Sequence, residues 1–191
     1  LPITIAIWSS NAIIHETHTH YQNVLCLSIG LSKVWISKFI AVAILVLTSN
    51  LIMWGGCTVL GLFTEMKVSV MNGFIGCLFL FLTFIWQIPI TMIIAKWTGY
   101  LFAILISFGC NMILSFVGTE KGLFFLNLYA IPSRIVCPFF KVQPNGIPLE
   151  QGSFLLETAN TPLALAVSLV AATFALLITA KLFSKGGKHY D

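Results

Sequence analysis

Long apolar runs separated by short polar stretches dominate the hydrophobic pattern of this chain. The runs at residues 36–60, 73–95, 100–117 and 162–181 hold almost no charged side chains. Each is close to the roughly 20 residues that a helix needs to cross a bilayer. Because every backbone polar group inside a membrane must be bonded within the protein, an α-helix is the natural form of such a segment. The pattern therefore predicts four complete membrane-spanning helices.

Two further regions depart from this simple pattern. Residues 1–14 are apolar but too short to span a bilayer, so we expect the end of a truncated span; a helix in the membrane interface is the alternative. Residues 118–160 mix four prolines with three acidic residues and an aromatic cluster. This composition predicts an external segment of short helices that cap the bundle or re-enter the membrane.

A polar stretch at residues 15–33 separates the first apolar run from the next. Its histidines and Glu16 would be costly to bury in hydrocarbon, so the stretch must lie at or beyond the lipid headgroups. Within it, Tyr21, Val24 and Leu25 recur at helical spacing. This spacing predicts an amphipathic helix that lies against an interface or a partner.

The distribution of charge predicts the orientation. Four spans place residues 15–33 and the C-terminal tail on the same side of the membrane. That side carries six lysines against Glu16 and Asp191, whereas the other side has equal numbers of cations and carboxylates. The positive-inside bias therefore predicts a cytoplasmic polar stretch and tail, and an external segment 118–160.

Composition narrows the class further. Hydrophobic residues make up 58% of the chain and charged residues only 8%, compared with about 25% charged in soluble domains. With a mean hydropathy of +0.98, these values predict an all-α polytopic membrane protein. The net charge of +4 is scattered, so we expect no nucleic-acid partner. The five cysteines form no CxxC pair, and packing is their expected role.

Several polar and aromatic side chains are candidates for function. The amides Asn50, Gln87 and Asn111 fall within apolar runs and are possible transport-path residues; interhelical hydrogen bonding is their other common use. Three tryptophans are predicted to be interfacial anchors rather than platforms for a substrate, although Trp86 stands inside the run at 73–95 and can lie deeper. They are Trp35, Trp86 and Trp97.

The histidine-rich start of the polar stretch offers imidazole and carboxylate groups, which are zinc ligands. However, the spacing of His15, His18 and His20 does not bring all three to one helix face, and the sequence has no HExxH motif. It also has no GxxxxGK[ST] phosphate loop. We therefore expect no metal, no catalytic residue and no nucleotide bound by this chain itself.

Four short motifs, in chain order, carry a family resemblance. They are Glu16 with Tyr21-Gln22-Asn23-Val24-Leu25, Ser32-Lys33-Val34-Trp35-Ile36-Ser37-Lys38, Trp86-Gln87-Ile88-Pro89, and Ala130-Ile131-Pro132-Ser133-Arg134 with Pro144-Asn145-Gly146. With them, the chain resembles the permease subunit of an ABC-2-type exporter, and within that family a lantibiotic self-immunity permease. The likeness covers essentially the whole chain. It departs from the family in having four spans and part of another instead of six, and in its histidine-rich segment.

The resemblance implies a type V exporter-like helical bundle in the bacterial plasma membrane. Such a permease expels a lantibiotic or similar peptide, is not an enzyme, and depends on a separate ABC ATPase subunit that binds ATP. The residues implied to couple to this ATPase are His15, Glu16, Tyr21, Gln22, Asn23 and Leu25. A second permease subunit, identical or related, would complete the path within the membrane lipid. Arg134, Glu150 and Glu157 would contact the peptide outside.

Three alternatives stay open. The nearest is an ABC-2 exporter of another antibiotic or of a lipid, and the next is a noncatalytic membrane assembly subunit. An intramembrane hydrolase is the third, and only His15, His18 and His20 offer it material for catalysis.

Overall fold

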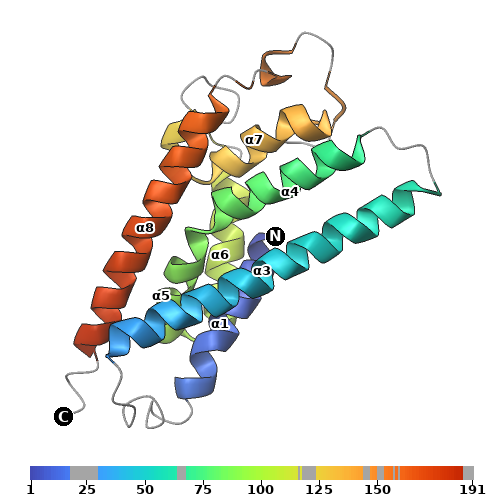
Figure 1. Ribbon diagram of the computed structural model, residues 1–191. Helices are drawn as coiled ribbons and strands as arrows, with labels where there is room; N and C mark the ends of the chain where they lie inside the picture. The colour runs from blue at the N-terminus through green and yellow to red at the C-terminus, as the bar shows by residue number, and fades with distance from the viewer. Residues whose placement is uncertain are drawn as a thin grey trace. The chain divides into compact units, whose positions relative to one another are not determined.

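The computed structural model describes residues 1–17, 30–63, 68–115, 117, 124–143, 147–149, 153–156, 158 and 160–186. Within these residues the secondary structure consists of seven α-helices and two short 3₁₀ helices, with one isolated β-bridge between Val142 and Pro148 (Figure 1). The predicted all-α class is therefore confirmed for the described part of the chain.

Among the described residues, two helices are long and apolar enough to cross a membrane, namely α3 and the part of α8 from Thr161 to Ser184. The broken pair α4 and α5 is a third candidate if it counts as one span. These lengths and compositions indicate a helical membrane protein. The α-helices are α1 (Pro2–Thr17), α3 (Leu31–Gly61), α4 (Val70–Phe84), α5 (Gln87–Thr98), α6 (Tyr100–Leu114), α7 (Ala130–Phe140) and α8 (Thr161–Gly186), and the 3₁₀ helices are η1 (Phe124–Leu126) and η2 (Phe154–Leu156).

The apolar runs of the sequence correspond to these helices to different degrees. The runs at 36–60 and 162–181 lie inside α3 and α8, whereas the run at 100–117 corresponds to α6, which has only 15 residues. The run at 73–95 is divided between α4 and α5 at Ile85 and Trp86. Pro89 stands in the first turn of α5, where a proline is tolerated because its missing N–H would have no helical partner. The break between α4 and α5 therefore lies a few residues before Pro89 and not at the proline itself.

The N-terminal helix continues into the predicted coupling segment. Residues 15–17 belong to α1, so the helix does not end at the boundary predicted after residue 14. The rest of that segment up to residue 29, with Tyr21, Gln22, Asn23 and Leu25, lies outside the described residues, as do the side chains of His15 and Glu16. In the segment predicted to hold short helices, the structure has η1, α7 and η2; their external location stays a prediction.

The chain divides into two compact units, each assembled from segments that are distant in sequence. Unit 1 comprises Leu1–Val46, Ile85–Gly109 and Val170–Asp191, and unit 2 comprises Leu47–Phe84 and Cys110–Leu169. In unit 1, α1 packs along α5. In unit 2, α4 packs along α7, and the two lie side by side in Figure 1.

The core of unit 1 is organised around Trp35, which is fully buried. Its indole Nε1–H donates to the hydroxyl of Thr179 at 3.0 Å, and its ring lies 4.6 Å from that of Phe183. The ammonium group of Lys96 stands 4.7 Å from the centre of the same Phe183 ring. These contacts join α3, α5 and α8 within the unit.

The predicted anchor role is wrong for Trp35, and Trp86 takes the deeper position that was its alternative. Trp35 and Trp86 are buried within the protein, at 0% and 3% exposure, so they do not form an aromatic belt at the lipid surface. Trp97 is 67% exposed and is still a candidate anchor. A position at the end of an apolar run does not reveal whether a ring faces lipid or another helix.

The core of unit 2 lies between α4, α7 and the start of α8. Phe124, Ile131, Ile135 and Ala164 form its buried cluster, and Phe79 meets Phe139 edge to face at 5.0 Å beside it. Gly76 permits the approach of α4 to α7, because a Cβ at this position would come within 2.9 Å of Phe140 Cζ. Aromatic side chains of the 118–160 segment thus contribute to packing.

Candidate functional site

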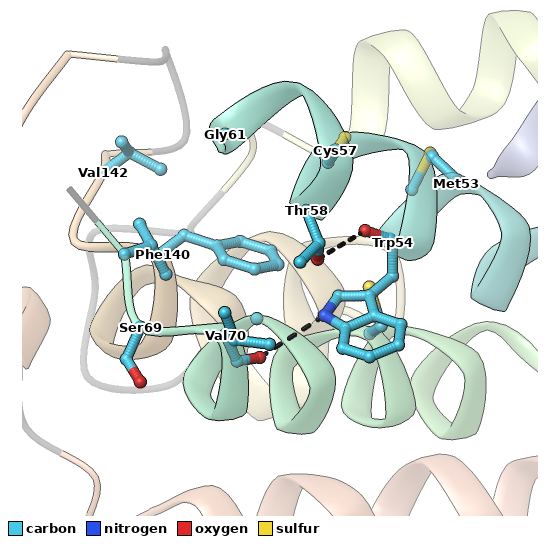
Figure 2. Close-up of a pocket in the computed structure, with 12 residues that line it drawn as sticks. Met53, Trp54, Cys57, Thr58, Gly61, Ser69, Val70, Phe140 and Val142 are labelled. Atoms are coloured by element: carbon cyan, nitrogen blue, oxygen red, sulfur yellow. Dashed lines mark hydrogen bonds between the residues drawn. The ribbon is translucent and has the colours of Figure 1, made fainter. Parts of the chain in front are cut away.

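A cavity of about 500 Å³ lies in unit 2, between the C-terminal half of α3, the start of α4 and the end of α7. Figure 2 shows Trp54, Thr58, Val70 and Phe140 around it. Its volume falls within the roughly 300–1,000 Å³ of typical small-molecule sites. The cavity is therefore large enough to hold a ligand, and its lining decides which kind.

One wall of the cavity is a single face of α3. Trp54, Cys57, Thr58 and Gly61 line it and recur at intervals of three and four residues, which places them on the same side of the helix. The Trp54 indole N–H donates to the carbonyl of Val70 at 3.4 Å, and the Thr58 hydroxyl donates to the carbonyl of Trp54 at 2.9 Å. These polar groups of the wall are thus engaged within the protein.

Asn50 stands one turn before Trp54 on the same face of α3 and is 1% exposed. Its Nδ2–H donates to the carbonyl of Cys77 at 2.6 Å, and Cys77 itself lines the cavity. The Oδ1 atom of Asn50 is buried and has no hydrogen-bond partner among the residues that the structure describes. Asn50 therefore forms an interhelical hydrogen bond from α3 to α4, the other common use of such an amide, and its role in a transport path stays a prediction.

Arg134 lies in α7 and is 4% exposed. Its guanidinium carbon stands 5.6 Å from the centre of the Phe124 ring, which belongs to the buried cluster of unit 2. An aromatic face partly compensates a desolvated cation, and arginine is the basic residue best suited to such stacking. Just ahead of α7, burial raises the pKa of the Tyr129 phenol, with a smaller contribution from Cys110.

Asn127 shapes the entry to α7 and was not among the residues predicted from the sequence. Its Nδ2–H atoms donate to the carbonyls of Leu114 and Val117, both at 2.8 Å, while its Oδ1 accepts from the N–H of Tyr129 at 3.1 Å. The side chain thereby joins the start of α7 to the carbonyl of Leu114, the last residue of α6, and to that of Val117 in the chain that follows. Asparagine is suited to such local bonds because its amide both donates and accepts.

The residues predicted for the transport path belong to different units. Asn50 and Asn111 are buried in unit 2, whereas Gln87 is buried in unit 1 as the first residue of α5. Arg134, predicted to contact the peptide outside, is also buried in unit 2. The backbone carbonyl of Asn111 accepts hydrogen bonds from the N–H and the hydroxyl of Ser115. The predicted external contacts Glu150 and Glu157 lie outside the described residues.

Within the described part of the chain, no group of three or more His, Cys, Asp and Glu side chains is arranged to hold a metal ion. Comparison with known proteins finds no match: no protein-family model, curated protein or solved structure is significantly similar to this chain. A functional assignment therefore has to be argued from the residues themselves.

Proposed function

We propose that this chain is the membrane-spanning permease subunit of an ABC exporter in the bacterial plasma membrane. It expels a lantibiotic or a similar antimicrobial peptide and thereby protects the cell that makes it. A separate ABC ATPase drives transport, and a second permease subunit, identical or related, completes the path. The sequence resemblance and the membrane-length helices α3 and α8 support this proposal.

The observation that carries the proposal is the burial of polar side chains in the apolar helices of unit 2. Asn50, Asn111 and Arg134 are only 1%, 5% and 4% exposed. Polar groups are costly in membrane segments, so the buried amides Asn50 and Asn111 are candidates for a substrate pathway. The buried Arg134, in the segment predicted to be external, is a candidate for the peptide contact outside. A permease for a cationic peptide needs such groups among apolar surface, because its cargo is both polar and apolar.

The proposed coupling begins at α1. This helix extends through residues 15–17, and its preceding turns pack along α5 in unit 1. Lys38 of α3 donates from its Nζ to the carbonyl of Ala12 in α1 at 2.6 Å. A force applied near Glu16 by an ATPase would therefore pass directly to α3 and α5.

A charge-removing variant tests the coupling. The chain is expressed with the ATPase that co-purifies from its native membrane, in a peptide-sensitive bacterium, and tolerance of a lantibiotic and ATP turnover are measured. Glu16→Gln is expected to abolish tolerance while the chain still inserts in the membrane. Glu65→Gln removes the same charge from a loop predicted to be external, so it is expected to leave tolerance unchanged.

Two outcomes would contradict this proposal. If no ATP-hydrolysing protein co-purifies with the chain, it is not an ABC permease. If Glu16→Gln leaves both tolerance and ATP turnover at the wild-type level, the segment does not couple to a motor, and a noncatalytic assembly subunit becomes the better assignment.

A further inference from the structure

The walls of the cavity beside Trp54 suit an apolar ligand. The Trp54 N–H and the Thr58 hydroxyl are both bonded to backbone carbonyls within the protein. Most of the remaining lining is apolar, with Met53, Val70 and Phe140 among it. A polar ligand group placed there would lose its hydration without gaining an equivalent partner, so the ligand is apolar along the part that enters.

Exposed apolar side chains stand next to the lining residues of α3 in the sequence. Met53 and Gly61 line the cavity, and their neighbours Ile52, Leu60 and Leu62 are 70%, 69% and 76% exposed. Because α3 is long and apolar enough to cross a membrane, lipid covers this exposed surface. An apolar cavity that is continuous with lipid fills with hydrocarbon, since an empty space forfeits dispersion contacts and water finds no polar partners there.

A lysine stands between two lining residues of the same cavity in the sequence. Lys141 is exposed and lies between Phe140 and Val142, where α7 ends. Its backbone is left-handed, with φ of 54°, although helices usually place glycine at this position. The Leu149 N–H donates to the Lys141 carbonyl at 2.9 Å and fixes the turn. The energetic cost of this conformation for a residue other than glycine supports a use for the charge of Lys141.

From these three observations we propose that the cavity holds one acyl chain of an anionic phospholipid, and that Lys141 binds the phosphate of its headgroup. The occupant is a lipid of the surrounding bilayer and not the exported peptide. This inference depends on the membrane helices and the cavity alone. It stands or fails independently of any partner ATPase.

Native mass spectrometry tests the cavity. The full chain is purified in mild detergent from membranes that contain phosphatidylglycerol and phosphatidylethanolamine, and the phospholipid that stays bound is counted. The wild-type chain is expected to retain phosphatidylglycerol in preference. Cys57→Phe fills part of the cavity from the α3 wall and is expected to abolish retention. Ile52→Phe adds a ring on the same helix outside the lining and is expected to retain lipid as the wild type does.

A second set of variants tests the headgroup contact. Lys141→Asn removes the charge but keeps a residue that tolerates the left-handed conformation. It is expected to lower bound phosphatidylglycerol about fivefold, which corresponds to about 1 kcal/mol for one lysine near an anionic lipid. Lys141→Arg is expected to retain the wild-type amount. Bound phosphatidylethanolamine is expected to fall less in Lys141→Asn, because its own ammonium group already neutralises its phosphate, whereas a general loss of structure would lower both lipids equally.

Three results would overturn the inference. Retention of lipid by a folded Cys57→Phe chain would show that the lipid binds elsewhere. If the Cys57→Phe chain does not fold, Val142→Phe, which fills the cavity from another wall, serves as the test variant. Equal retention of both lipids, unaffected by Lys141→Asn, would exclude the phosphate contact. Displacement of the lipid by a cationic lantibiotic at stoichiometric concentration would assign the cavity to the peptide.

Discussion

The interhelical hydrogen bonds of the two compact units have different surroundings. In unit 1, the Trp35 indole N–H is bonded to Thr179, and the Lys38 ammonium group is bonded to the backbone of α1. The Trp35 bond fixes the arrangement of α3 and α8 there, because a movement would leave a buried donor without an acceptor. Not every buried polar atom of this unit is bonded, since Ser9 Oγ and Ser10 Oγ have no hydrogen-bond partner among the described residues.

In unit 2, the corresponding interhelical bond lies beside a cavity. Asn50 donates to the Cys77 carbonyl, its Oδ1 has no partner in the described structure, and a cavity of about 500 Å³ lies one helical turn away. Space beside an incompletely bonded group allows another molecule to bind. The Trp35 contacts of unit 1 therefore have the features of a scaffold, whereas the interhelical bond of unit 2 stands next to space for a ligand.

The largest expected effect concerns the scaffold. Trp35→Ala removes a fully buried side chain and its bond to Thr179, and is expected to lower the free energy of unfolding by about 3–5 kcal/mol. Trp97→Ala, at a 67% exposed position, is expected to change it by less than about 0.5 kcal/mol. Unfolding in mixed detergent micelles measures both. Equal effects of the two substitutions would show that Trp35 is not a core residue.

This pair of tryptophans also shows the limit of prediction from sequence. Both stand at the end of an apolar run, and the sequence signal for an interfacial anchor is the same for each. What distinguishes Trp35 is its contact with Thr179, which is 144 positions away in the chain. Local composition sufficed to predict α3 and α8, because helix length and hydropathy are properties of a single segment.

The candidate site divides in the same way. Asn50, Gln87 and Asn111 were identified from the sequence because amides in apolar runs are conspicuous, whereas Arg134 was named only through the family resemblance. The cavity was not predicted, since its lining comes from α3, α4, α7 and the chain that follows α7. No single segment carries its pattern, and only the packing of α4 along α7 assembles it.

Two glycine substitutions in unit 2 are expected to change stability by an intermediate amount and in opposite directions. Gly76→Ala brings a Cβ to within 2.9 Å of Phe140 Cζ, so the ring must move, and we expect a destabilisation of about 1 kcal/mol. Gly56→Ala meets no atom within 4 Å and is expected to stabilise α3 by up to about 1 kcal/mol, because alanine favours the helix. The same unfolding assay measures both variants. Stabilisation by both would contradict the tight approach of α4 and α7.

Asn50→Leu has the smallest expected change in the free energy of unfolding. Its effect on peptide tolerance tests whether the amide serves a transport path or packing. The substitution removes one hydrogen bond, and interhelical bonds in membranes average only about 0.6 kcal/mol. It also removes a buried Oδ1 that has no partner in the described residues, which offsets part of that loss. Thr58→Val, which removes a bond made within α3 itself, is the matched control.

If the amide serves a transport path, Asn50→Leu lowers peptide tolerance while its unfolding free energy stays within about 0.5 kcal/mol of the control. A loss of tolerance only in proportion to a loss of stability would instead make Asn50 a structural bond between α3 and α4, and unit 2 would then differ from unit 1 in its cavity alone.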